Sequence, residues 1–484
     1  MTLTVDATGE KDRVFSPGDI EALIASGQSI VIIDQKVLRL DAWLPYHPGG
    51  YKPIQHFIGK DATNEFIVMH SAETRQQIDR YQIGRIEGRW RNLLPPIQGG
   101  PHRDGAKEAL ELTPQLSSEH NGPEELAFLN AQTKEEIRLT LDRYPSLDAS
   151  TQSQIIERYR RLYDQIHAEG LAYLREFGRC ALLFAIMLAF LHLEWYCTSA
   201  VFLGWFWSQM VFAAHDAAHM AITHDFFIDN LIGMIIAAPI GGLSLGWWKR
   251  THNVLTTSLF STYHERLMPY TELAQRLVPY QAYLYYPLLM FSRFNLYVQS
   301  WLFLAYGQDP RKGLTWWHRY FEIAGNLVFW AWFGYGIVCR SLPTPATRVL
   351  YVLISHAVTM PLHVQFTLSH FAMSTADLGP NESFPQRMLR TTMDVDCPEW
   401  LDWVHGGLQF QAIHHLFPRV PRHNLRRVQK LVLEFCREAG IPYALYGFVG
   451  GNRKVVGSLA EVGRQAAILA ECKRVVAGRM TQPR

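Results

Sequence analysis

The chain has 484 residues, enough for two or three domains, and its formal net charge of +2 is nearly balanced. It has no basic block with interleaved aromatic residues to indicate nucleic acid binding. Its six cysteines show no CxxC spacing, which argues against a disulfide framework. Hydrophobic residues reach 48% while the mean hydropathy stays near zero, so we expect the apolar residues to be concentrated in blocks. The polar N-terminus resembles neither a signal peptide nor a transit peptide, so internal segments must provide membrane attachment.

Residues 14–90 are expected to form a small soluble domain of mixed α and β structure. Ile30–Ile33 is a continuous apolar run typical of a buried strand. Residues 47–50 (HPGG) form a predicted tight turn, and His70 lies 23 residues after His47. Two such imidazoles can be axial ligands of haem iron, and the glycines let the backbone approach a flat cofactor closely.

This region resembles cytochrome b5 over residues 15–90. The resemblance rests on the HPGG turn and His70 together with Asp34 and the segments 40–44 (LDAWL) and 59–63 (GKDAT). It implies a haem b group held by His47 and His70 and used for one-electron transfer. His56, close to the HPGG turn, is the competing ligand.

Residues 91–150 are predicted to be a linker, because residues 91–125 are rich in proline, glycine and charge. Residues 151–178 follow with apolar side chains at helical spacing among many charges. This pattern predicts an amphipathic helix, which either lies at a membrane surface or packs on the next domain.

Four apolar segments are each close to the ~20 residues that a transmembrane helix needs; they are residues 178–197, 198–214, 321–338 and 349–368. Two other stretches, 231–246 and 283–306, are interrupted by proline and glycine or by polar residues. We assign them to the membrane interface or to re-entrant packing. Two spans then precede the first of the histidine clusters described next and two more precede the second, which places both clusters on the side of the N-terminal domain. The basic residues on that side favour the cytosol.

Two histidine clusters follow apolar segments. Residues 215–219 (HDAAH) come after the apolar run 180–214, and residues 411–415 (QAIHH) come about forty residues after the run 349–368. Imidazole suits iron, copper and zinc, and ionisable residues beside membrane segments are functional candidates. Histidines four apart on a helix share one face. The clusters therefore predict a metal centre that acts on a substrate dissolved in lipid.

The fused haem domain, HDAAH and QAIHH together resemble the membrane front-end desaturases, and the likeness covers most of residues 150–450. Members of that family place three histidine boxes around two non-haem irons. The resemblance implies an α+β cytochrome b5-like domain followed, over residues 151–450, by a mainly α-helical membrane domain with four transmembrane helices. Residues 451–484 are expected to form a helical tail.

Finer likeness points to the fungal sphingolipid Δ8 desaturases, and it rests on segments 246–250 (GWWKR), 363–366 (HVQF), 384–386 (FPQ), 391–398 (TTMDVDCP) and 405–410 (HGGLQF). The resemblance implies a double bond formed at C8–C9 of the long-chain base of ceramide. It implies O2 as the oxidant and electrons that pass from NADH through cytochrome b5 reductase to the fused haem. It also implies a multi-pass protein of the endoplasmic reticulum membrane, with the haem domain and the histidine boxes in the cytosol.

The resemblance also implies a set of iron ligands, which is His215, His219, His252, His370, Gln411, His414 and His415. Gln411 stands where other desaturases have a histidine, and His370 ends the last apolar run. We expect His224 to be an outer-shell partner of the ligands, and His405 and His423 to arrange loops near the site.

The second histidine box departs from the family pattern HxxHH. After residues 247–249 (WWK) the chain reads HNVLT over residues 252–256, so Leu255 and Thr256 stand where the family has two histidines. The sequence then continues like family sequence from farther downstream, which indicates that a few tens of residues are missing. Neither leucine nor threonine replaces imidazole at iron, so we expect this chain to desaturate poorly or not at all. His264 is the candidate replacement ligand near the gap.

Three other interpretations stay open, namely a front-end acyl-lipid desaturase of Δ5 or Δ6 type, a catalytically dead membrane haem protein and a lipid hydroxylase. QAIHH and the four-span layout argue against the hydroxylase. Periodicity and spacing do not distinguish a sphingoid base from a fatty acyl chain.

Overall fold

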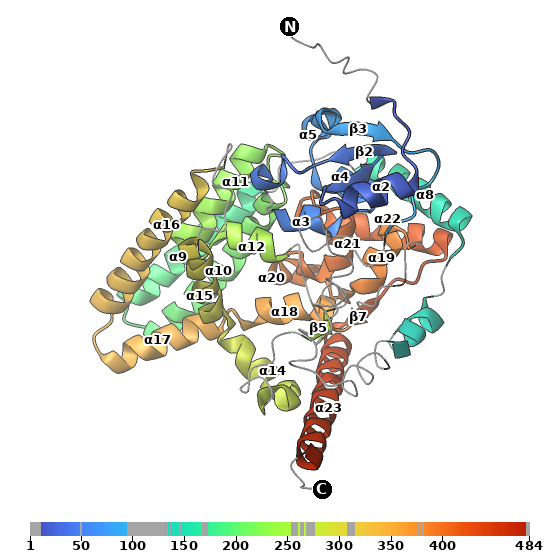
Figure 1. Cartoon of the computed structure of the whole chain (residues 1–484). Coiled ribbons are helices and arrows are strands. Elements are labelled where there is room, and N and C mark those ends of the chain that lie inside the picture. The colour runs from blue at the N-terminus through green and yellow to red at the C-terminus, as the bar shows by residue number, and fades with distance from the viewer. Residues whose placement is uncertain are drawn as a thin grey trace.

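The computed structural model describes residues 11–48, 51–93, 131, 134–135, 137–144, 147–166, 173–252, 260–261, 266–267, 276–306, 315–374, 378 and 382–480. Most of the predicted linker 91–150 lies outside these residues, as do residues 253–256 of the second box and His264. An N-terminal α+β domain, blue in Figure 1, lies against a larger helical domain.

The N-terminal domain is built on a three-stranded antiparallel sheet in the order β1-β2-β3. Its elements are α2 (Pro17–Ala25), β1 (Ile30–Ile33), β2 (Lys36–Arg39), η1 (Leu44–Tyr46), α3 (Tyr51–His56), α4 (Thr63–Met69), α5 (Ala72–Gln76), η2 (Gln77–Arg80) and β3 (Gln82–Arg85). Successive side chains of a strand point to opposite faces. Ile30 and Ile32 therefore pack in one apolar cluster, and Val31 and Ile33 pack in another. Burial on both faces explains why the strand is a continuous apolar run.

Three helices in the described part of the chain are long and apolar enough to cross a membrane, namely α10 (Tyr196–Ala218), α16 with η6 (His318–Phe329 and Trp330–Ser341) and α17 with α18 (Pro345–Ala357 and Met360–Phe371). They contain three of the four predicted spans, 198–214, 321–338 and 349–368. The remaining prediction is not confirmed, because its range 178–197 crosses a turn.

Helix α9 (Tyr173–His192) occupies most of that range and packs along α10. The chain turns at Glu194, where φ is 63°, so Tyr196 and Cys197 already belong to α10. The first turns of α9 carry charged residues, including Glu176 and Arg179, which shorten its apolar part. By length and composition, α9 is therefore not among the candidate spans.

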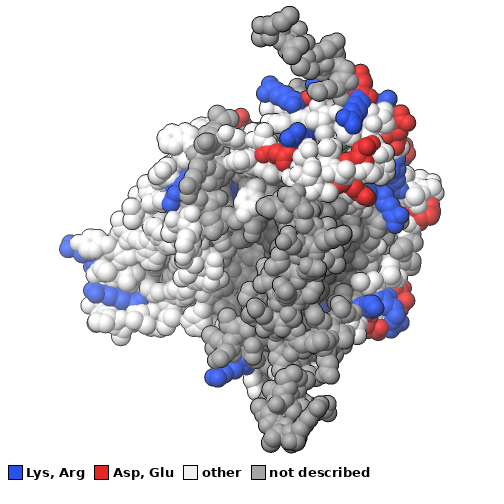
Figure 2. Space-filling model, in the orientation of Figure 1, with Lys and Arg blue, Asp and Glu red and all other residues white. Residues whose placement is uncertain are grey.

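The outer faces of the candidate spans are apolar. Figure 2 shows charged side chains of both signs over the N-terminal domain, whereas the described surface over α16 and α17 is mostly white, with a few basic side chains at one end. Leu327, Tyr335 and Val349 on this surface are each about 60% exposed. Large exposed apolar surfaces of this kind mark contact with a membrane or a partner.

The stretches assigned to the interface form shorter helices. Residues 231–246 lie in α11 (Phe226–Ile235), η4 (Ile236–Ile240) and the start of α12 (Leu245–His252), and residues 283–306 lie in α14 (Gln281–Met290) and α15 (Ser292–Tyr306). The helix Phe226–Ile240 is apolar but shorter than a span. Small elements between α12 and α14 are β4 (Phe260–Ser261), β5 (Arg266–Leu267) and η5 (Val278–Tyr280).

The remaining elements form the part of the helical domain that lies beneath the N-terminal domain in Figure 1. They are α8 (Ala149–Ile166), α19 (Phe384–Thr391), β6 (Asp394–Asp396), η7 (Glu399–Leu401), α20 (Asp402–His405), η8 (Leu408–Phe410), α21 (Gln411–Leu416), η9 (Arg422–Asn424), α22 (Leu425–Ala439), β7 (Leu445–Gly447) and α23 (Phe448–Met480). Strands β6 and β7 pair in parallel. Helix α23 extends away from the rest of the molecule (red in Figure 1).

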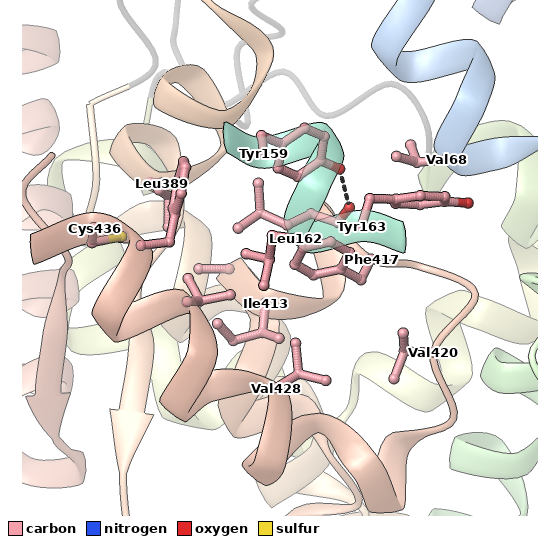
Figure 3. Close-up of a cluster of buried hydrophobic side chains, with 14 of the residues drawn as sticks. Val68, Tyr159, Leu162, Tyr163, Leu389, Ile413, Phe417, Val420, Val428 and Cys436 are labelled. Carbon is pink, nitrogen blue, oxygen red and sulfur yellow. Dashed lines mark hydrogen bonds between the residues drawn. The ribbon is translucent and has the colours of Figure 1, made fainter. Parts of the chain in front are cut away.

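Helix α8 is the amphipathic helix that the sequence predicts, and its apolar face is covered by protein. Tyr159 and Tyr163 are buried in a cluster with Ile413, Phe417 and Val428 (Figure 3). The Tyr159 hydroxyl donates to the Leu416 carbonyl at 2.6 Å. Of the two alternatives for this helix, the structure therefore shows packing on the next domain and not burial of its apolar face in a membrane surface.

Candidate haem and metal sites

His47 and His70 face each other in the N-terminal domain. His47 follows η1 and His70 ends α4, and their ring centroids lie 6.2 Å apart. An imidazole nitrogen lies about 2 Å from a first-row metal ion and the ring centre about 1 Å farther, so two axial imidazoles on one ion place their centres about 6 Å apart. The separation of His47 and His70 therefore fits a haem iron.

The environment of His70 suits a metal ligand. Its Nδ1 lies 3.1 Å from the Phe66 carbonyl oxygen, so a proton on Nδ1 leaves the Nε2 lone pair for a metal. Burial and the neighbouring His47 lower the pKa of His70 to about 4. The imidazole is then neutral at physiological pH, and neutral imidazole is the form that binds metal.

The histidines of HDAAH and QAIHH converge, although about 200 residues separate them in the sequence. His215 lies in the last turn of α10, His219 caps that helix and His414 lies in α21. One ring nitrogen of each lies within 4.8 Å of the other two. His215 and His414 are buried and His219 is half-buried. Ligands of a single ion lie roughly 3–4 Å apart, so small side-chain adjustments would let these three hold one metal ion.

A second group lies beside the first. The rings of His370, from α18, and His415 lie 5.0 Å apart, and Gln411 Nε2 is 3.3 Å from His415 Nε2. The ring of His414 lies 4.5 Å from that of His215 and 4.6 Å from that of His219, whereas the adjacent His415 lies beside His370, so the two residues belong to different groups. Burial, followed by the charges of His370 and His215, lowers the pKa of His415 well below its ordinary value. The donor sets therefore suit two neighbouring ions.

The helix that leads into the second box passes beside the first group. The Trp248 ring, on α12, lies 5.2 Å from the ring of His215 and 5.4 Å from that of His219. His252 ends α12 one turn later. The side chain of His252 is outside the described part of the structure, so its role as a ligand stays a prediction.

An ionic network behind His215 was not foreseen from the sequence. Arg422 Nη2 lies 2.9 Å from Glu176 Oε2, and Arg422 Nε lies 3.8 Å from Asp216 Oδ2. Asp216 Oδ1 is in turn 3.7 Å from His215 Nδ1. A carboxylate next to a ligating histidine orients the ring and raises its basicity. The only sequence signal for this network is the position of Asp216 between the two histidines of HDAAH.

A buried carboxylate also fixes the QAIHH helix. Asp394 Oδ1 accepts the Ala412 N–H at 2.6 Å, and the Tyr443 hydroxyl donates to Oδ2. Asp394 thus satisfies a free N–H in the first turn of α21. Burial raises the pKa of Asp394 to about 7, although the hydrogen bonds from Tyr443 and the backbone oppose this rise. The sequence marks residues 391–398 only as a family likeness.

The other predicted histidines occupy loops and helix ends. His224 is exposed, and its Nδ1 lies 2.9 Å from the Met220 carbonyl oxygen. Within the described residues it makes no contact with the ligand groups, which gives no support to its predicted outer-shell role. His405 is buried at the end of α20, and His423 lies in η9 next to Arg422.

Comparisons with known proteins cover both domains. Residues 193–447 match the fatty acid desaturase family, and residues 17–87 match the cytochrome b5-like haem/steroid binding domain. The chain is 50% identical to a Delta 8-(E)-sphingolipid desaturase of Emericella nidulans, over 97% of this chain and 98% of the relative. It is 43% identical to a Delta 8-(E)-sphingolipid desaturase of Kluyveromyces lactis, over 96% and 95%. An acyl-lipid (9-3)-desaturase of Borago officinalis is 27% identical over 91% of each chain.

The alignment with the Emericella protein extends over 533 positions, whereas this chain has 484 residues. At least 49 aligned positions therefore have no residue here. This total is large enough to include the few tens of residues expected to be missing after His252. Taken with the two converging histidine groups, the matches show that the chain belongs to the fatty acid desaturase family, a family of oxidoreductases, as a member with an N-terminal cytochrome b5 domain.

Proposed function

We propose that this protein is built to form the double bond at C8–C9 of the long-chain base of ceramide, and that the polypeptide as it stands does so poorly. The observation that carries the first part is 50% identity, over nearly the whole of both chains, with a relative named for this reaction. The acyl-lipid alternative is represented at 27% identity. The proposal that the polypeptide desaturates poorly rests on the incomplete second histidine box.

The two histidine groups would hold two iron ions. His215, His219 and His414 would bind one ion, and His370, His415 and Gln411 the other, with His252 as a further ligand. The irons, when bound, supply the reduction of O2 and the removal of hydrogen from unactivated methylenes, which no side chain can perform. Overall, two adjacent methylenes lose two hydrogens, and O2 takes up these hydrogens with two electrons and two protons to give two waters.

The protein's own groups would orient the ligands. The Arg422–Asp216 pair would hold the His215 ring by its Nδ1 side, and Asp394 with Tyr443 would fix the turn of α21 that carries His414 and His415. Outer groups of this kind typically change metal affinity or activity by about 10–100-fold. Direct loss of ligands from the second box should cost more.

Electrons would reach the site through haem b at His47 and His70, supplied from NADH by cytochrome b5 reductase. We also propose a multi-pass protein of the endoplasmic reticulum membrane, with the haem domain and histidine groups on the cytosolic side. Helix α9 would be the fourth transmembrane helix, because it packs along α10 and exposes Leu182 and Leu188. Four crossings keep both histidine groups on one side.

Product analysis tests the proposed substrate. The chain should be repaired by inserting, after His252, the segment that the Emericella relative has there, and expressed in a host that lacks Δ8-unsaturated sphingolipids. We expect mass spectrometry to find Δ8-unsaturated long-chain bases and unchanged fatty acids. Unsaturated acyl chains without an altered long-chain base would replace our proposal with the acyl-lipid alternative.

A further inference from the structure

The helix that ends at the haem ligand His70 is not open to solvent but packs on the desaturase domain. Val68 of α4 is only 2% exposed. It belongs to the apolar cluster that contains Tyr163 of α8 and Phe417, which directly follows the QAIHH helix (Figure 3). The haem domain and the third histidine box thus share one core.

Polar contacts surround this apolar contact. Arg160 Nε lies 3.3 Å from Asn64 Oδ1, and the Tyr163 hydroxyl donates to the Ile67 carbonyl at 3.3 Å. Arg387 of α19 forms an ion pair with Glu65, whose side chain is 17% exposed. Four residues from one turn-and-a-half of α4 therefore engage three elements of the desaturase domain.

Arg419 connects the haem ligand to the metal ligands. Its Nη1 donates to the His70 carbonyl oxygen at 3.1 Å. Arg419 comes four positions after His415 in the chain, a reach of at most about 14 Å. One arginine therefore joins the backbone of a haem ligand to the segment that carries two iron ligands.

The other haem-ligand segment faces the same domain. Pro48, which follows His47, lines a small cavity together with Asn230 of α11 and Lys249 of α12. Both haem-ligand segments are therefore turned towards the desaturase domain, one beside the QAIHH helix and one beside the helix that enters the second box. A packing contact formed by chance would not be expected to orient both.

We propose that the α4 face, defined as Asn64, Glu65, Ile67, Val68 and His70, is an intramolecular docking surface that holds the haem in the position from which it passes electrons to the histidine site, with Arg419 as the positioning residue. This inference rests on the proposed binding of haem by His47 and His70. With haem and irons bound, single electrons would pass from the reduced haem to the histidine site without making or breaking a bond. A flavoprotein reductase that oxidises NADH would then reduce the haem again.

Zero-length cross-linking tests the docking in the haem-loaded full chain. In the Arg387→Lys variant, a carbodiimide should join the introduced amine to the Glu65 carboxylate, because Arg387 and Glu65 are in direct contact in the unaltered protein. We expect mass spectrometry to find this cross-linked peptide pair and to lose it when Glu65→Gln is added. The Lys36–Asp79 pair, 2.6 Å apart within the haem domain, should cross-link in every variant and serves as the internal control.

The haem reduction potential tests the role of Arg419. Arg419→Gln removes a positive charge next to His70. Loss of this charge favours the ferric haem, so the reduction potential should fall. Arg419→Lys keeps the charge, so its reduction potential should fall less. Arg464→Gln, on exposed α23, is the matched control and should change nothing. A normal bis-histidine haem spectrum without the 65–387 cross-link, or with an unchanged potential in Arg419→Gln, would overturn the docking inference alone. Absence of that spectrum in the unaltered chain would instead contradict the haem ligation on which it rests.

Discussion

The haem site and the histidine site of this protein differ in how much of the chain each requires. The two haem-ligand candidates come from one stretch, between residues 47 and 70, within a domain that has its own sheet and apolar clusters. The histidine site draws its candidates from α10, α12, α18 and α21, between residues 215 and 415. A missing internal segment can therefore leave the first site complete and remove some ligands from the second.

Such a chain would belong to its enzyme family along its whole length and yet lack part of the proposed catalytic centre. Among the described residues, Asp394 holds the first turn of α21 and Arg422 lies beside Asp216 at the end of α10, and both support the convergence of the first and third boxes. Sequence identity to relatives, the fold and haem binding therefore do not predict the catalytic rate.

Restoring the missing segment should have the largest effect. We expect the repaired chain to bind two non-haem irons per haem and to desaturate more than about 100-fold faster than the 484-residue chain, because first-shell ligands matter more than outer-shell groups. Iron and haem are counted by elemental analysis and absorbance, and product by mass spectrometry. Rapid turnover and two non-haem irons in the unrepaired chain would show that other ligands replace the second box.

Single ligand substitutions should separate the two sites. His70→Ala should abolish the haem Soret band and leave non-haem iron unchanged, whereas His414→Ala should lower non-haem iron and leave the Soret band unchanged. In each variant the affinity for the lost metal group should fall by more than the roughly 10–100-fold typical of outer-shell changes. The controls are His56→Ala, which should keep its haem, and His224→Ala, which should keep its iron. Loss of haem in His56→Ala would show that His56 is a haem ligand and would contradict the assignment to His47 and His70.

The difference in stability between the unaltered protein and Asp394→Asn should depend on pH. The fold raises the pKa of this carboxyl to about 7, so it favours the protonated form. The stability contributed by Asp394 is therefore full below about pH 4 and is lost as the pH rises to about 7, by at most about 4 kcal/mol. Asp394→Asn cannot titrate, so thermal unfolding of the iron-free chain should show the unaltered protein losing stability relative to this variant across that range.

Asp396→Asn provides the matched control, because Asp396 lies on the same strand but is exposed. A difference between Asp394→Asn and the unaltered protein that stays constant across this pH range would contradict the raised pKa of Asp394.

Removal of the Ser16 helix cap should have the smallest effect, a loss of stability confined to the haem domain. Ser16 caps α2, since its hydroxyl accepts the Asp19 N–H at 3.2 Å and the Asp19 carboxylate accepts the Ser16 N–H at 2.9 Å. Ser16→Ala should destabilise this domain by about 1 kcal/mol, measured as earlier loss of the Soret band in denaturant. Non-haem iron should not change, and Ser16→Thr should restore most of the stability. An equal loss of iron would show that the domains unfold as one unit.

The sequence predicts most reliably what depends on nearby residues. The strand Ile30–Ile33, the helical spacing of HDAAH and three of the four apolar spans each follow from a local pattern, and the structure has them. The fourth prediction, 178–197, is wrong at its end, because hydropathy alone does not reveal the turn at Glu194. The convergence of His215 with His414 is predicted only through the family resemblance.

What the sequence does not predict depends on distant partners. Nothing in the residues around Asp394 shows that it caps α21, because its partners Ala412 and Tyr443 lie later in the chain. The same holds for Arg422, which reaches back to Glu176 on α9. The periodicity of α8 predicts an apolar face but not what covers that face, since lipid and protein bury the same side chains.

The residues that fix α21 are synthesised after the metal ligands, which affects when iron can bind. Tyr443 and strand β7 come after every candidate metal ligand in the chain, and both are needed to complete the surroundings of Asp394. A nascent polypeptide that has emerged from the ribosome only as far as His415 would already hold all the coordinating side chains, yet without the partners that fix them. Stable iron binding should therefore wait until Tyr443 and β7 have been synthesised and β7 has paired with β6.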